Sequence, residues 1–157
     1  MTNIHENFMS EALCFARLAA SEGEVPVGAI IVHNNQIIGV GRNAREKDQN
    51  ALAHAEMIAI SEACGALSSW RLLDCDLYVT LEPCPMCAGA IVNSRIRRVI
   101  FGAYDPKSGA LGSVFDINSF SLNHKPEVIS GVLENECAHE LSMFFSSLRE
   151  KRNTSSQ

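Results

Sequence analysis

A junction between a strand and a helix, marked by two cysteines, most constrains how this chain can fold. In TLEPCPMCAGA, residues 80–90, Cys84 and Cys87 stand three positions apart, directly after a β-rich run. Pro83 ends that run. Pro85 suits the first turn of a helix, because the N–H that proline lacks has no partner there. The sequence therefore predicts a strand that passes straight into a helix whose first turn carries two thiols.

Alternating strand and helix patterns surround this junction. In order, we expect a helix over about 4–21, strands over about 27–32 and 36–41, a helix over about 54–65, a strand over about 75–81, a helix from about 85, strands over about 97–102 and 127–131, and a final helix over about 133–148. The polar segment from Arg42 to Asn50 is an expected loop and a candidate wall of a site. Such alternation indicates an α/β fold in which helices cover both faces of one sheet.

Length and charge narrow the class of protein. The 157 residues suit a single domain that buries its own core. Because no apolar run reaches the roughly 18–20 residues of a membrane span and no secretion signal is recognisable, we expect a cytoplasmic protein. The net charge of −5 argues against broad nucleic-acid binding through many phosphate contacts. Nine of the 13 Lys and Arg residues fall in 70–157, which leaves either a local basic surface or ordinary charged solvent faces.

The cysteine pair by itself allows three interpretations. It can be a redox pair, half of a four-cysteine structural zinc site, or part of a mixed zinc site. The structural zinc site needs a second close pair, and the remaining cysteines offer none: Cys14, Cys64, Cys75 and Cys137. We expect those four to be small buried hydrophobic residues. The redox interpretation stays open, because a helix N-terminus favours the thiolate of Cys84.

A second motif favours the mixed zinc site. In LAHAEMIA, residues 52–59, His54 and Glu56 lie where a loop enters a helix. If two neighbouring strands end at one edge of the sheet, both helix starts meet in the crevice where α/β proteins usually bind ligands. His54, Cys84 and Cys87 then supply three zinc ligands and leave a fourth position open for water, as in catalytic sites. Bound zinc lowers the pKa of water from 15.7 to about 7.

Glu56 is the candidate general acid and base of this arrangement. It lies two residues after His54, so its carboxylate can sit beside the metal without binding it and transfer protons. The alternative is a solvent-facing helix glutamate. The order H-A-E followed by P-C-x-x-C is the signature of zinc-dependent nucleobase deaminases.

Beyond the metal motif, the chain resembles the tRNA-specific adenosine deaminase family of the cytidine deaminase-like superfamily. The resemblance runs from about residue 8 to 150 and includes three further blocks: EVPVGAIIV at 24–32, LYVTLEPCPMCAGAIVNSRI at 77–96 and VIFGAYDPKSGALGS at 99–113. It implies a three-layer α/β/α fold with a central five-stranded mixed sheet. It also implies one CMP/dCMP-type deaminase domain over 1–152. The polar composition of the last five residues, 153–157, predicts a disordered tail.

The same resemblance implies a reaction and its partners. Each subunit of a homodimer would hold one zinc ion, and Glu56 would catalyse the hydrolytic deamination of a wobble adenosine to inosine. The partner would be a tRNA anticodon loop, with an arginine tRNA bearing an ACG anticodon as the expected substrate. Flipped bases in pockets suit the recognition of single-stranded RNA by shape and stacking.

Three further residues receive roles from the resemblance. Asn43 would hydrogen-bond the flipped base, Asp105 would lie in a loop near the RNA backbone, and Phe145 would border the RNA path together with the tail from Arg149 to Arg152. Phe145 also fits the apolar stripe of the final helix, which gives it a purely structural alternative.

Two departures from the family bear on the substrate. The family has Asp-Pro-Thr before Ala-His-Ala-Glu, where this chain has Asn50-Ala51-Leu52, and the segment from Gly112 to His124 is shorter. A second hypothesis is therefore a deaminase of a free base or nucleoside, such as guanine, cytosine or cytidine. A third, from another class, is a zinc or redox module without catalysis.

Overall fold

Five strands form one mixed sheet in the computed structural model, which describes residues 3–155. Across the sheet they are β2 (Gln36–Arg42), β1 (Gly28–His33), β3 (Cys75–Leu81), β4 (Arg98–Ala103) and β5 (Glu127–Ile129). β1 is antiparallel to β2 and β3, whereas β3, β4 and β5 run parallel. The expected five-stranded mixed sheet is confirmed.

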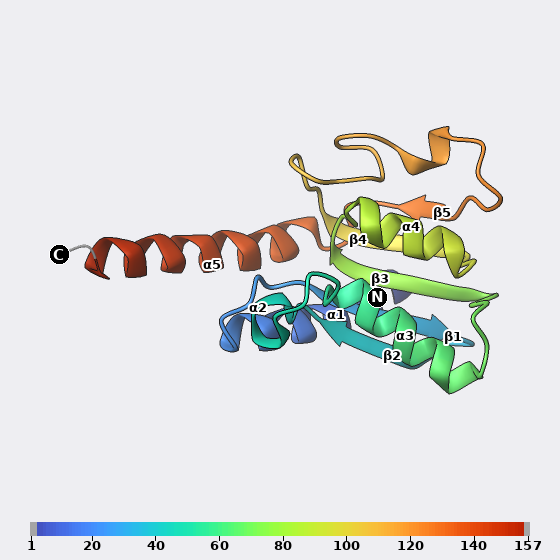
Figure 1. Ribbon diagram of the computed structural model, residues 1–157, viewed down its shortest axis with the longest axis horizontal. Helices are drawn as coiled ribbons and strands as arrows, with labels where there is room; N and C mark the ends of the chain where they lie inside the picture. The colour runs from blue at the N-terminus through green and yellow to red at the C-terminus, as the bar shows by residue number, and fades with distance from the viewer. Residues whose placement is uncertain (1–2, 156–157) are drawn as a thin grey trace.

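Helices cover both faces of this sheet (Figure 1). On one face lie α1 (Ile4–Ser21) and the first turns of α5 (Glu134–Ser155), and on the other lie α3 (Ala55–Leu67) and α4 (Pro85–Asn93). Two short elements complete the fold, α2 (Arg45–Asp48) and the 3-10 turn η1 (Ile117–Ser119). Each face has its own apolar core, so the three-layer prediction is correct.

Local chemistry explains the hairpin that starts the sheet. Asn34 and Asn35 connect β1 to β2 with φ values of 52° and 61°. Asparagine tolerates positive φ better than other non-glycine residues, and two such residues in a row suit the turn that matches strand twist. The expected hairpin therefore forms with β1 inside the sheet and β2 at its edge.

Two glycines of β2 let α3 pack directly on the sheet. A Cβ atom on Gly39 would lie 2.4 Å from the carbonyl oxygen of Ala59, and one on Gly41 would lie 2.1 Å from that of Ala55. Neither position has room for a side chain. This close approach fixes the first turn of α3, and with it His54, relative to the sheet.

Two segments of the chain differ from expectation. The loop expected between Arg42 and Asn50 contains α2. Toward the C-terminus, α5 packs on the sheet only at its start and then extends away from the body (Figure 1). It continues to Ser155, so residues 153–155 of the expected disordered tail are helical, and 156–157 lie outside the described residues. Within residues 3–155, no helix combines the length and apolarity needed to cross a membrane.

The four cysteines outside the motif are not all buried. Cys75 and Cys137 are buried as expected, and Cys64 is half-buried. Cys14 is exposed, so the prediction for it was wrong. Cys14 lies on the solvent side of α1, whose buried face instead carries Met9, Leu13 and small alanines.

Candidate active site

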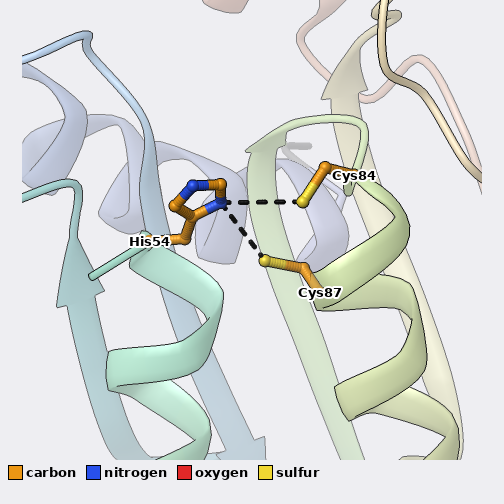
Figure 2. A group of neighbouring side chains, drawn as sticks. All are labelled: His54, Cys84 and Cys87. Carbon is orange, nitrogen blue, oxygen red and sulfur yellow. Dashed lines mark hydrogen bonds between the residues drawn. The ribbon is translucent and has the colours of Figure 1, made fainter. Parts of the chain in front are cut away.

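Two helix starts meet at the end of the sheet where β3 finishes. His54 and Cys84 are the N-cap residues of α3 and α4, and both have extended backbones, with φ/ψ of −85°/150° and −75°/174°. Neither side chain makes a capping hydrogen bond to its own helix. Both are therefore free to turn toward each other, while Cys87 projects from the first turn of α4 (Figure 2).

The spacing of these three side chains suits a tetrahedral metal site. His54 Nδ1 lies 3.6 Å from Cys84 Sγ and 3.6 Å from Cys87 Sγ (Figure 2). All three ligand atoms lie within 4.8 Å of one another. Bonds of about 2.3 Å to sulfur and about 2.0–2.1 Å to nitrogen would place tetrahedral S and N ligands about 3.6 Å apart. The donor set and its spacing therefore fit a metal ion.

The two thiols have opposite tendencies to ionise. A hydrogen bond with Cys87 lowers the pKa of Cys84 to about 4, against the opposing effect of burial, and His54 adds to the lowering. The same hydrogen bond, together with burial, raises the pKa of Cys87. The pair thus places its first negative charge on Cys84. A cation bound between the sulfurs would favour loss of the second proton as well.

Glu56 lies buried next to the thiols. Only 4% of its surface is exposed, which rules out the solvent-facing alternative. Burial raises its pKa to about 7, despite lowering contributions that include the charge of His54 and a hydrogen bond with Cys87. A carboxyl group with this pKa can both accept and donate a proton near neutral pH.

These residues border a cavity of about 190 Å³. Its walls include His54, Glu56 and Cys84 on one side and Asn43 on another. The cavity is smaller than the roughly 300–1,000 Å³ of sites that enclose drug-sized ligands, and it suits one flat heterocycle.

The Asn43 amide is held in place but not saturated. It accepts a hydrogen bond from the Arg45 N–H at 3.2 Å and donates one to the Val25 carbonyl at 3.3 Å. An amide side chain has two donors and an oxygen with two lone pairs, so one donor and one lone pair remain for a ligand.

Of the remaining predicted residues, one lies at the cavity and one does not. Asp105 borders the cavity, and its carboxylate accepts hydrogen bonds from the N–H groups of Lys107 and Ser108 at 3.0 and 3.2 Å. Phe145 lies on α5, outside the cavity lining, with 42% of its surface exposed. It contacts Phe144 edge-on, with ring centroids 5.4 Å apart.

Sequence reasoning missed two buried carboxylates, Glu24 and Glu82, each only 2% exposed. Glu82 lines the cavity, and Glu24 holds the N–H groups of Glu46 and Lys47, next to the lining residue Arg45. A signal was present in the quoted motif, because Glu82 follows the buried strand β3 directly and precedes Pro83. A charged residue there needs partners, but the sequence does not show which ones.

Known proteins resemble the chain along nearly its whole length. It is 53% identical to the tRNA-specific adenosine deaminase of Bacillus subtilis (strain 168) over 148 residues, which cover 94% of this chain and 92% of the relative. It is 48% identical to the tRNA-specific adenosine deaminase of Haemophilus influenzae, with 94% and 86% covered. A sequence profile of MafB19-like deaminases matches residues 3–140.

Solved structures extend this result to the fold. One solved structure superposes on this chain with a TM-score of 0.80 at 45% identity. It comes from biochemical and structural studies of A-to-I editing by tRNA:A34 deaminases at the wobble position of transfer RNA. It covers 86% of this chain and 99% of that one. The guanine deaminase of Bacillus subtilis superposes with a TM-score of 0.62 at 40% identity, over 66% of each chain.

Proposed function

Because the chain belongs to the deaminase family that includes the tRNA-specific adenosine deaminases, we propose that it converts the wobble adenosine of a tRNA anticodon to inosine by hydrolysis. One observation carries this proposal. A buried carboxyl group, Glu56, shares a base-sized cavity with a His–Cys–Cys cluster that fits a metal ion.

The metal we propose is zinc, one ion per subunit, held by His54, Cys84 and Cys87. One imidazole and two thiolates are a ligand set typical of zinc, and three protein ligands leave a position open, as in catalytic sites. When bound, zinc lowers the pKa of water to about 7 and so makes a nucleophile available at neutral pH.

Glu56 then moves the protons. It accepts a proton from the attacking water, whose oxygen forms a bond to carbon 6 of adenine, and it delivers a proton to ring nitrogen 1. A further proton transfer through Glu56 reaches the exocyclic amine, the bond from carbon 6 to that nitrogen breaks, and ammonia leaves. Water and adenosine are consumed, and inosine and ammonia are formed. Asn43, with its unused donor and lone pair, orients the base.

The proposed substrate is an anticodon loop, with the arginine tRNA bearing ACG as the first candidate. Asp105 is negatively charged and repels phosphate, so we assign its contact to hydroxyl groups of the RNA, such as the 2′-OH. Phe145, exposed on the extended part of α5, offers a ring for stacking. We also propose a homodimer and, given the substrate, a cytoplasmic location, with residues 1–152 as the deaminase domain.

A free purine is the second candidate substrate. The similarity to the Bacillus subtilis guanine deaminase favours it, and so does the small size of the cavity, which a free base would also fit. A redox module is less well supported, because it would leave the cavity and the buried Glu56 without a role.

The test is direct. Zinc-loaded protein is incubated with a transcript of the arginine tRNA bearing ACG, and its cDNA is sequenced for A read as G at the wobble position. We expect conversion there alone, and Glu56→Gln should slow it by at least about 100-fold because the proton carrier is lost. Glu62→Gln, an exposed carboxylate on the same helix, is the matched control and should convert normally. If zinc-loaded protein does not convert the tRNA but deaminates free guanine, the substrate is a free purine and not the anticodon loop.

A further inference from the structure

Glu82 is a buried carboxylate whose described partners all come from one loop. It accepts hydrogen bonds from the N–H groups of Asp105, Leu111 and Ser113 at 3.0, 3.1 and 3.1 Å, and from the Ser113 hydroxyl. Among residues 3–155, no basic side chain forms an ion pair with it. The hydrogen-bond donors of the 105–113 loop therefore stabilise the buried carboxylate of Glu82, which directly follows β3.

Four hydrogen bonds from the loop converge on the two oxygens of this one carboxylate. Hydrogen bonds to a charged group are stronger than those between neutral groups. The carboxylate and the loop thus hold each other in place.

Gly109 shows how closely the loop approaches. A Cβ atom at this position would lie 2.3–2.5 Å from the carboxyl atoms of Glu82. A side chain at this position would force the loop and the carboxylate apart, by displacing one or the other. The close fit is independent evidence that the loop is seated on Glu82.

The position of this loop matters because it forms one wall of the cavity. Asp105 and Ser108 line the cavity together with Asn43 and Arg45, and the N–H of Asp105 is itself bonded to Glu82. The segment that carries Asn43 and Arg45 has a similar anchor, since the Glu24 carboxylate accepts hydrogen bonds from the N–H groups of Glu46 and Lys47 at 3.2 and 2.6 Å. Two segments that line the cavity are thus each seated on a buried carboxylate.

We propose that Glu82 is a positioning residue for substrate binding, which holds the 105–113 loop at the distance from Glu56 that the wobble base requires. The described hydrogen bonds of its carboxylate all come from this loop and none from His54, Glu56, Cys84 or Cys87, so it acts through the loop. The identity of the substrate rests on the proposed function above, whereas the anchoring of the loop does not depend on it.

The test is Glu82→Gln, which keeps the shape of the side chain but replaces one acceptor oxygen with an NH₂ group facing loop donors. We expect KM for the tRNA to rise by about tenfold or more, since hydrogen bonds to a charged acceptor are lost. The kcat at saturating tRNA should stay within about twofold, and zinc should remain at one per chain. Hydrogen exchange of the N–H groups of residues 105–113 should accelerate, because the loop loses its anchor.

Gly109→Ala provides a second route to the same loop, without changing the charge of Glu82, and keeps the test valid if Glu82→Gln fails to fold. It should raise KM and loop exchange in the same way. Both substitutions disrupt the same contact, between Glu82 and the loop. The double variant should therefore have a KM little higher than that of the more affected single variant. Gly65→Ala, at a helical glycine with open space around it, is the matched control and should leave KM unchanged.

Two outcomes would overturn the proposal. In one, loop exchange and KM stay at wild-type values in folded Glu82→Gln. In the other, kcat and zinc content fall while KM is unchanged, which would place Glu82 in the support of the metal site. Wild-type protein that does not convert the tRNA would instead contradict the proposed function, and the exchange measurement would still decide whether Glu82 anchors the loop.

Discussion

At the scale of single residues, the site depends on side chains that are individually unfavourable to bury. Glu56 is almost fully buried, and its pKa is raised to about 7. The pKa of Cys84 is lowered to about 4, since its thiolate is stabilised first by Cys87. Such opposite shifts within one cavity are typical of functional sites, where each group is adjusted to a different task.

The division of labour between ligands and proton carrier predicts how zinc content responds to substitution. Cys84→Ser should weaken zinc binding by at least about 100-fold, because loss of an outer-shell partner alone costs 10–100-fold. Glu56→Gln should retain one zinc per chain. Competition with a chromophoric chelator, followed by metal analysis, measures both.

Cys14→Ser is the control for this experiment, because Cys14 is exposed on α1. It should bind zinc as the wild type does. Full zinc retention by Cys84→Ser, or complete loss in Glu56→Gln, would show that the roles have been assigned to the wrong residues.

At the scale of elements, α5 contacts the body at its start and then extends away from it (Figure 1). Cys137 in its first turns is 1% exposed, whereas Met143 and Phe145 further along are 59% and 42% exposed. α5 leaves the body at the end of the sheet where α3 and α4 begin (Figure 1). The core therefore leaves the Phe145 ring partly uncovered on this extended part of α5.

Phe145→Ala tests whether this ring contacts the RNA. We expect kcat/KM for the tRNA to fall by about tenfold, because stacking of a base on an aromatic ring contributes roughly 1–3 kcal/mol. The melting temperature should change little, since 42% of Phe145 is exposed and its described ring contact is with its neighbour Phe144. Met143→Ala, on the same helix and more exposed, is the control. Equal losses in the two variants, or none in either, would contradict a specific role for Phe145.

At the scale of the whole molecule, the two ends of the sheet have separate tasks. The His54–Cys84–Cys87 cluster lies where β3 finishes, while at the start of β3 Asp76 accepts hydrogen bonds from both Arg97 and Arg98, at 2.7–3.2 Å. Burial acts to raise the pKa of Asp76, and the two guanidinium groups outweigh it and lower the pKa below 3.8. This ionic cluster contributes to stability without touching the site.

Asp76→Asn should therefore destabilise the protein at pH 7 by about 1–3 kcal/mol while leaving KM for the tRNA unchanged. Because the folded pKa is lowered, the contribution of Asp76 is present above its ordinary pKa of 3.8 and is lost as the pH falls through the folded value. Urea unfolding of both proteins between pH 7 and pH 3 measures this. A difference that stays constant over that range would exclude ionised Asp76 as the cause.

The sequence by itself determined the elements and the chemical types at the site. β3 spans the expected residues 75–81, because β-branched and aromatic residues followed by proline specify a strand and its end locally. His54, Cys84, Cys87 and Glu56 were recognisable because a zinc site needs particular atoms, and those atoms belong to few residue types. These inferences depend on neighbours in the chain.

Only the tertiary structure decided how these residues meet. The 3.6 Å spacing between His54 and the cysteines depends on the sheet order and on the close packing of α3 on β2. Contacts between remote segments also bury Glu56 and seat a loop 23 or more residues away on Glu82. Nor did the apolar pattern of α5 reveal that Phe145 remains exposed. The distance between two remote segments and the burial of a side chain both depend on how the whole chain packs. A local sequence pattern contains no information about either.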